Sequence, residues 1–252
     1  YPCLFLYQVA LYRKGIVDDT FICGGTLIAP DMVLSAAHCL HRYHDRYVSP
    51  EIIRIIAGIH DLDNKEFGRS FDVLEIRPHP DYDSNTQDND LVVIKLNGSS
   101  NYEPILLNES EIVPSEDQDL HVIGWGNTNE MGNPSSILQE VTVNHLTTEN
   151  CRTQYETPFV QWRDYGIDLD ITESMMCASD EGEDACSGDS GGPLIIKGEG
   201  ESSDVQVGVV SWGIGCATYP GVYSRVSFAY DWIWRIICNS SVSPPDGCHR
   251  FR

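Results

Sequence analysis

The chain of 252 residues is long enough to bury a full hydrophobic core, either as one large all-β domain or as two smaller ones. Its hydrophobic content of 41% is ordinary for a globular protein and argues against wholesale disorder. Acidic residues outnumber basic ones by 38 to 16, and the formal net charge of −22 argues against a nucleic acid or an anionic membrane as a partner.

Short strand-like runs separated by turn residues recur along the chain. Many are β-branched and are bounded by Gly, Pro, Asn or Asp, which predicts an all-β sandwich or barrel. The clearest runs are residues 4–12, 32–36, 52–57, 91–96, 120–123, 139–143 and 205–210.

One convincing helix is predicted near the end, over residues 227–238, with Ser227 as its N-cap. Its apolar side chains recur at helical spacing and form one stripe. The residues of this stripe are Phe228, Trp232, Ile233, Ile236 and Ile237. The following residues, 239–252, contain two adjacent prolines and are expected to form a loop.

The cysteine content indicates an oxidising compartment. Nine cysteines are present and none forms a C-x-x-C pair, so their spacing does not resemble a structural zinc site. Asn97, Asn108 and Asn239 each begin an Asn-x-Ser triplet, an acceptor for glycosylation that also arises by chance. No apolar run approaches the roughly 18 residues that cross a bilayer, and no signal peptide is visible. We therefore expect an extracellular protein with upstream sequence removed ahead of Tyr1.

A serine among glycines is the first candidate for chemistry. The stretch DACSGDSGGP, residues 184–193, places Ser190 on backbone that can turn tightly and approach another molecule, because glycine lacks a Cβ. A hydroxyl becomes a nucleophile only beside a base, and a plain Gly/Ser/Asp surface turn is the alternative interpretation.

A base and an acid with suitable surroundings occur upstream. His38, in LSAAHC, follows small residues that leave one face of the imidazole open. Asp90, in NDLVVIKL, stands directly before an apolar strand, where a carboxylate without a partner would be costly. Such an acid can fix the tautomer of a catalytic imidazole. Taken singly, a histidine is more often structural than catalytic, and the alternative interpretation of the aspartate is a turn residue that ends a loop.

LSAAHC, NDLVVIKL and GDSGGP, in this order, resemble the trypsin-like serine peptidases. CGGTLI, GWGN, SWG and PGVYSRV lie in matching places, so the resemblance extends from about Tyr7 to about Cys238. The α/β-hydrolases also place their serine in G-x-S-x-G, but they carry serine, acid and histidine in that order, and this chain has the reverse order without βαβ alternation. The resemblance implies an all-β fold of two packed six-stranded antiparallel Greek-key barrels with a C-terminal helix. The peptidase domain would cover 1–238, with barrels at about 1–104 and 105–226, and a tail at 239–252.

The resemblance also implies a mechanism. Ser190 would attack a peptide carbonyl, His38 would transfer the proton, and Asp90 would orient His38. The N–H groups of Gly188 and Ser190 would form the oxyanion hole. The alternative is a catalytically silent homologue that acts as a binding module, although such proteins usually lack one of these three residues.

Substrate choice is implied by the residue six positions before the serine. There Asp184 would lie at the base of the specificity pocket and select Arg or Lys. Trypsins that carry a serine next to this acid have one more group for a lysine ammonium, and Ala185 lacks that hydroxyl, so we expect Arg to be preferred. The remaining expected substrate-binding residues are Ser211, Trp212, Gly213 and Gly221.

Disulfides are implied in the same way. The family pairs correspond to Cys23–Cys39, Cys151–Cys177 and Cys186–Cys216. In the tail we expect Cys238 to pair with Cys248, without a family precedent, and Cys3 is left over.

Activation is the largest departure from the family pattern. Family members become active when a new Ile or Val ammonium pairs with the acid before the nucleophile, here Asp189. Ile16-Val17 resembles such a terminus, but it follows the first strand closely and is expected in a hairpin loop. The activating segment would precede Tyr1, so we expect this chain to be zymogen-like, with Asp189 unpaired.

Two long loops, in residues 40–50 and 156–174, would border the cleft. The calcium loop of the family aligns with residues 58–68, where Ile59 replaces a carboxylate ligand. Asp61, Asp63 and Glu66 remain, but we predict no cofactor and do not predict calcium. The expected partners are polypeptide substrates and protein inhibitors of proteases, and the protein is expected to be a monomer.

Overall fold

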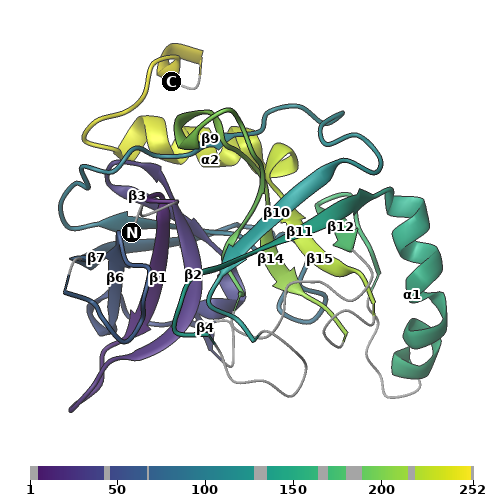
Figure 1. Ribbon diagram of the computed structural model, residues 1–252, viewed down its shortest axis with the longest axis horizontal. Coiled ribbons are helices and arrows are strands. Elements are labelled where there is room, and N and C mark those ends of the chain that lie inside the picture. The colour runs from purple at the N-terminus through teal and green to yellow at the C-terminus, as the bar shows by residue number, and fades with distance from the viewer. Residues whose placement is uncertain are drawn as a thin grey trace.

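The computed structural model describes residues 5–42, 46–66, 68–127, 135–163, 170–179, 189–214 and 219–250. Two β-barrels lie side by side in Figure 1, the first at the left and the second at the right. No helix in these described ranges is long and apolar enough to cross a membrane.

The first barrel is a closed ring of six strands in the order β1-β2-β3-β8-β7-β6, with every neighbouring pair antiparallel. Its interior is filled by β-branched and leucine side chains, which pack well on pleated strands. The strands are β1 (Gln8–Arg13), β2 (Thr20–Ala29), β3 (Met32–Ser35), β6 (Ile53–Ala57), β7 (Arg69–Pro78) and β8 (Val92–Leu96).

The second barrel is also six-stranded, and the pairing of β13 with β14 closes it. The short strand β9 (Leu106–Leu107) joins β14 from outside the ring and is parallel to it. The ring strands are β10 (Asp119–Gly124), β11 (Gln139–Leu146), β12 (Met175–Ser179), β13 (Pro193–Ile196), β14 (Val205–Trp212) and β15 (Gly221–Arg225). The expected fold of two six-stranded antiparallel barrels is therefore confirmed.

The smaller elements connect the barrels or extend them. A hairpin of β4 (His41–Arg42) and β5 (Arg46–Tyr47) lies within the first long loop expected at the cleft. Single turns of 3-10 helix are η1 (Ala37–Cys39), η2 (Pro50–Ile52), η3 (Glu201–Ser203) and η4 (Cys248–Arg250).

The C-terminal helix α2 (Val226–Ser240) agrees with the predicted span to within two residues, but two details of the prediction are wrong. Arg225 occupies the N-cap position, and the buried Ser227 Oγ has no hydrogen-bond partner among the described residues. Phe228 is 51% exposed, whereas Ile233 and Ile237 are buried. The buried stripe therefore begins with Val226 and Ala229 instead of Phe228.

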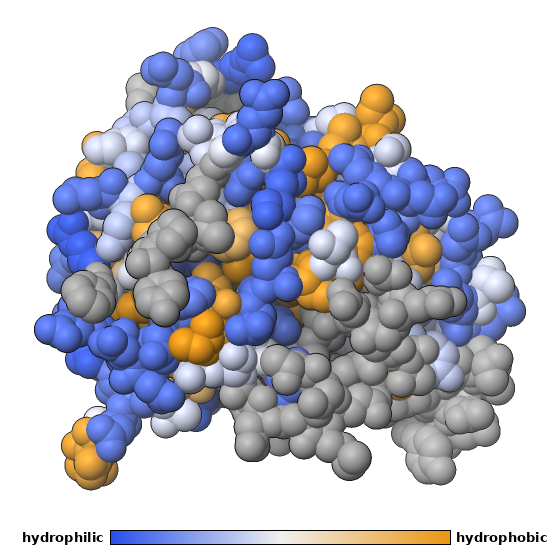
Figure 2. All heavy atoms as spheres, viewed as in Figure 1, coloured by the Kyte–Doolittle hydropathy of each residue, from blue (hydrophilic) through white to orange (hydrophobic). Residues whose placement is uncertain are grey.

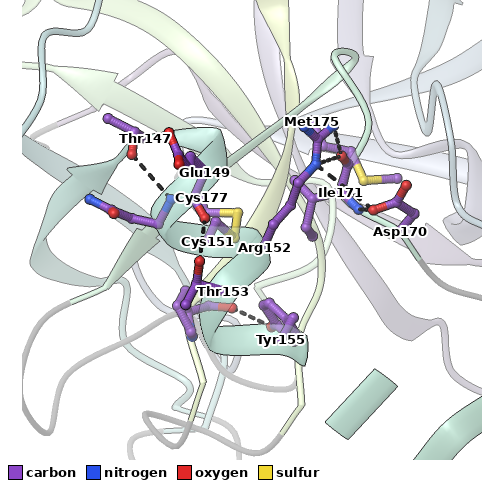
Figure 3. The surroundings of a disulfide bond; sticks show 12 residues. Thr147, Glu149, Cys151, Arg152, Thr153, Tyr155, Asp170, Ile171, Met175 and Cys177 are labelled. Atoms are coloured by element: carbon purple, nitrogen blue, oxygen red, sulfur yellow. Dashed lines mark hydrogen bonds and ion pairs between the residues drawn. A yellow bond between two sulfur atoms is a disulfide. The ribbon is translucent and has the colours of Figure 1, made fainter. Parts of the chain in front are cut away.

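A second helix was not predicted. The first part of residues 156–174, expected to be a loop, belongs to α1 (Thr148–Arg163), which stands at the right edge of Figure 1. The helix is anchored to β12 by the Cys151–Cys177 disulfide, and Arg152 donates to the carbonyl of Ile171 in the segment before that strand (Figure 3). Cys151 and Tyr155 are buried. These tertiary contacts stabilise a helix that its intrinsic helix propensity alone would not.

The turn between β1 and β2 carries Ile16 and Val17, which are fully exposed. The hairpin projects at the lower left of Figure 1, and the same corner of Figure 2 is orange. Ile16-Val17 thus lies in a hairpin loop, as expected.

Candidate active site

His38 and Asp90 meet at one end of the first barrel. His38 lies in η1, directly after β3, and Asp90 lies two residues before β8. His38 Nδ1 is 2.7 Å from Asp90 Oδ2, and the His38 main-chain N–H donates to Asp90 Oδ1 at 2.8 Å. Two contacts to one carboxylate fix both the ring and the backbone of the histidine.

The second barrel supplies further partners for Asp90. Ser211 Oγ donates to Asp90 Oδ2 at 2.6 Å, and Ser224 Oγ donates to the main-chain oxygen of Asp90 at 3.0 Å. The Asp90 side chain is completely buried, so burial alone would raise its pKa. The charge of His38 and the hydrogen bonds from His38 and Ser211 outweigh burial and hold the pKa of Asp90 below its ordinary value.

His38 is the partly exposed member of this pair, with 27% of its side chain accessible. Burial lowers the pKa of its imidazole, but the Asp90 carboxylate has the larger combined effect through its charge and hydrogen bond, so that the pKa of His38 is raised. The pair thus stabilises the imidazolium and makes His38 a stronger base, which accepts a proton at Nε2 while Nδ1 is held by Asp90.

Ser190 approaches the first barrel through its backbone. Its carbonyl accepts a hydrogen bond from the Gly24 N–H at 2.8 Å. Gly191 has φ +77°, and a Cβ there would lie 2.3 Å from Ser35 Oγ. Only glycine fits this approach, which brings the serine loop against the strand that leads to His38. No hydrogen bond joins Ser190 Oγ to His38 among the described residues, and Nε2 lies 3.8 Å from the Sγ of Cys39.

Asp189, the acid before the serine, is buried and is not left without a hydrogen bond. Its Oδ1 accepts the Gly126 N–H at 2.8 Å. This contact is a hydrogen bond and not the ion pair with an activating ammonium, so the zymogen-like state stays a prediction. A Cβ on Gly124 or Gly126 would lie within 2.3 Å of a carboxylate oxygen of Asp189. These glycines therefore make room for the acid beneath the serine loop.

The structure describes one side of the expected specificity pocket. Ser211 and Trp212 end β14, and a Cβ on Gly213 would lie 3.9 Å from the Cα of Gly221, so the two glycines face each other. Asp184, Ala185 and Gly188 lie outside the described residues, as does the Cys186–Cys216 pair.

Tyr155 of α1 is a supporting residue that the sequence did not indicate. Its ring packs edge-on against Trp212 at 5.4 Å and stacks on Tyr219 at 5.7 Å. Its hydroxyl donates to the carbonyl of Pro220 at 2.5 Å. Tyr155 lies more than 50 positions before each of these partners in the chain, and no sequence spacing links them.

Three of the expected disulfides are confirmed. Cys23–Cys39 lies beside His38, Cys151–Cys177 ties α1 to β12, and Cys238–Cys248 closes the tail. Cys3, whose partner was left open, lies outside the described residues.

Metal binding remains a matter of prediction. In the segment aligned with the calcium loop, Asp61 Oδ1 accepts the N–H of Asp63 at 2.9 Å, and Ile59 is buried. The donor atoms of His38, Cys23 and Cys39 also lie together, but both sulfurs belong to a disulfide and are not thiolate ligands.

Comparison with known proteins identifies the family. The Trypsin family model matches residues 2–233. The chain is 36% identical to Trypsin-1 of Astacus astacus in an alignment of 238 residues that covers 91% of this chain and 93% of that protein. It is 37% identical to Trypsin delta of Drosophila melanogaster, covering 91% of this chain and 82% of that protein. It is also 34% identical to the Vitellin-degrading protease of Bombyx mori, covering 92% of this chain and 81% of that protein. The chain belongs to the trypsin family and is a serine endopeptidase.

Proposed function

We propose that the protein hydrolyses peptide bonds after Arg, and more slowly after Lys, with Ser190, His38 and Asp90 as its catalytic triad. The observation that carries this proposal is the bidentate contact of Asp90 with the ring and backbone of His38, together with the Ser211 hydroxyl from the other barrel. That arrangement orients an imidazole as a general base.

In the proposed reaction Ser190 Oγ attacks the carbonyl carbon and transfers its proton to His38 Nε2. The C–N bond then breaks as His38 gives that proton to the leaving amine, and an acyl-enzyme remains. Water attacks the acyl-enzyme with His38 again as base, and Ser190 is regenerated. The N–H groups of Gly188 and Ser190 stabilise the oxyanion, a contribution of about 10²- to 10³-fold for one donor.

Specificity for a cationic side chain is proposed from Asp184 and from the two glycines that face each other, Gly213 and Gly221. A carboxylate at the base of a pocket pairs with a guanidinium through two parallel hydrogen bonds. Ala185 offers no hydroxyl to a lysine ammonium, which favours Arg. A silent homologue is not favoured, because the His38–Asp90 pair is intact and the serine is present.

We also propose that the protein is secreted and acts as a monomer on polypeptides, subject to protein inhibitors. Of its three glycosylation triplets, Asn97 and Asn239 are exposed. The buried Asn108 donates both amide hydrogens, to the carbonyls of Ser110 and Val113. A glycan is therefore expected on Asn97 or Asn239 and not on Asn108.

The buried Asp189 would accept the ammonium that activates family members, in addition to its Gly126 contact.

The test compares kcat/KM on matched peptide amides that differ only in Arg, Lys or Leu at the cleaved position. We expect Arg above Lys and little turnover of Leu. Ser190→Ala should lower kcat by about 10⁶-fold, as removal of the nucleophile does in related mechanisms. Asp184→Ala should remove the preference for cations. Turnover of lysine equal to that of arginine would refute the specificity, and full activity of Ser190→Ala would refute the mechanism.

A further inference from the structure

The loop that leads to Asp90 carries a second aspartate whose contacts cross between the barrels. Asp88 Oδ1 accepts a hydrogen bond from Thr172 Oγ1 at 2.6 Å and another from Ser174 Oγ. Thr172 and Ser174 lie just before β12 of the second barrel, with their hydroxyl oxygens 3.0 Å apart. We refer to Asp88, Thr172, Ser174 and the main-chain N–H of Asn89 as the Asp88 clamp.

The clamp holds backbone on both sides of the contact. Ser174 Oγ accepts the Asn89 N–H at 3.3 Å, and the Ser174 carbonyl accepts the Arg225 N–H at 2.7 Å. Ser224, the neighbour of Arg225, donates to the main-chain oxygen of Asp90 at 3.0 Å. Asn89 and Asp90 are therefore both hydrogen-bonded through their backbone to the second barrel.

The backbone around Asp88 is strained. Gln87 has φ +59° and Asn89 has φ +53°, a left-handed conformation that side chains with a Cβ adopt at a cost in free energy. Such residues persist when the surrounding contacts determine them, and they gather at functional sites. Asp88 lies between the two strained residues, so its hydrogen bonds act where the loop would otherwise relax.

We propose that Asp88 is a positioning residue, which fixes the Asp90 loop against the second barrel and thereby holds the Asp90 carboxylate on His38. This inference rests on the proposed triad. His38 and Asp90 belong to the first barrel and Ser190 to the second, so the alignment of the three depends on contacts that span the two barrels. The Asp88 clamp is such a contact, two residues from Asp90.

The groups that act on His38 make this role measurable. In the part of the chain that the structure describes, the charged group that faces its imidazole is the Asp90 carboxylate. Cys39 also contacts the ring, but its sulfur is in a disulfide and does not titrate. Ser211 acts on His38 through Asp90, to which it donates a hydrogen bond, and the phenol of Tyr82 stays neutral because burial raises its pKa. A loosened Asp90 loop should therefore appear as a lower pKa of His38.

Four variants separate the role of the acceptor oxygen from a general effect on the loop. Asp88→Ala removes the acceptor, whereas Asp88→Asn keeps an oxygen that both hydroxyls can reach. Thr172→Val with Ser174→Ala removes the donors from the opposite barrel. Asp83→Ala is the matched control in the same loop, because among the described residues Asp83 Oδ1 bonds only to Asn85, at 2.8 and 3.0 Å.

The experiment is an NMR titration of the His38 imidazole in each variant, with kcat and KM on an arginyl amide measured alongside. We expect Asp88→Ala and the Thr172/Ser174 double variant to lower the pKa of His38 by about 0.5 to 1 unit, since the contact of an opposite charge is loosened. Their kcat should fall about 10-fold with little change in KM, because misplaced catalytic groups cost rate even when the cause is distant. Asp88→Asn and Asp83→Ala should titrate like the original protein.

An unchanged His38 titration in Asp88→Ala would overturn the inference, as would an Asp88→Asn variant with a pKa lowered as far as that of Asp88→Ala. The titration needs no substrate, so it tests the clamp separately from the proposed function. A protein that shows the expected titrations but hydrolyses no peptide would contradict only the proposed function. Melting curves of all four variants identify any that do not fold.

Discussion

At the scale of single residues, the contact between His38 and Asp90 carries the chemistry. Asp90 is held by the ring and backbone of His38 and by Ser211, so its buried charge is fully hydrogen-bonded. Asp90→Asn keeps the shape of the side chain but favours the wrong tautomer of His38. The same exchange in a related triad lowers kcat by about 10⁴-fold, and we expect a loss of that order here. A kcat within 10-fold of the original on an arginyl amide would contradict it.

The pH dependence of activity follows from the same pair. Burial lowers the pKa of His38, but the charge and hydrogen bond of Asp90 together raise it by more than burial lowers it. The pKa of His38 therefore ends above its ordinary value of 6.5. Since the neutral imidazole is the base, kcat/KM should fall as the pH drops through this raised pKa. We expect the midpoint of the acidic limb above 6.5. A midpoint below 6.5 would show that Asp90 does not act on His38 in this way.

The sequence indicated His38, Asp90 and Ser190 because each stands in a short motif, and the order of the motifs excluded one alternative fold. It gave no indication of Ser224, Tyr155 or the contacts of Asp88. Ser224 and Asp88 act across the two barrels, and all three residues have partners more than 50 positions away. Their side chains are common types in common contexts. Only the folded chain brings them together.

At the scale of elements, a buried ion pair holds the end of α2 to the first barrel. Asp31 pairs with Lys95 of β8, and Lys95 also donates to the Ser240 carbonyl at 2.8 Å. The same carboxylate accepts Ser241 Oγ at 2.6 Å and the Val242 N–H at 2.9 Å. A cation at the end of a helix complements its dipole, so the pair both caps α2 and fixes the start of the tail.

Removing the charge of Asp31 leaves Lys95 buried without its counter-ion. Asp31→Asn should therefore lower the free energy of unfolding by about 3 kcal/mol, in the range found for broken buried pairs. Asp72→Asn is the matched control, because its pair with Lys14 is exposed and such pairs contribute about 0 to 1 kcal/mol. Urea unfolding measures both. Equal effects of the two variants would show that the Asp31 pair does not stabilise α2.

The Asp31 pair also predicts a loss of stability in acid. Burial raises the pKa of Asp31, but Lys95, Ser241 and Val242 together lower it below the value of 3.8 in the unfolded chain. Its contribution is therefore complete above pH 3.8 and is lost as the pH falls through the lower folded value. Melting temperatures of the original protein and Asp31→Asn should converge in that range. A constant difference down to pH 2 would contradict this.

The strands were predictable because alternation and turn residues are local signals, and all seven predicted runs overlap strands of the two barrels. Helix α1 was not predictable, since its sequence mixes Thr, Gln and Pro with few apolar residues. A disulfide and the burial of Tyr155 hold it in place. These tertiary contacts override local propensity and leave no trace in the spacing of the residues.

At the scale of the whole molecule, the charge of −22 should steer cationic substrates toward the enzyme. Hydrophilic residues cover most of the described surface in Figure 2. Because the screening length is about 10 Å at 0.1 M salt, kcat/KM for an arginyl peptide should fall several-fold between roughly 0.01 M and about 0.5 M salt. The rate of labelling by a neutral fluorophosphonate is the control and should change little. Equal salt dependence of both rates would argue against steering.

The most direct test of the central claim is covalent labelling of the enzyme by a fluorophosphonate, with the modified residue identified by mass spectrometry. This measurement requires the nucleophile and its base but no assumption about the substrate. The account predicts one adduct, on Ser190, and labelling that becomes far slower in His38→Ala. An adduct on another serine, or labelling of His38→Ala at the original rate, would contradict it.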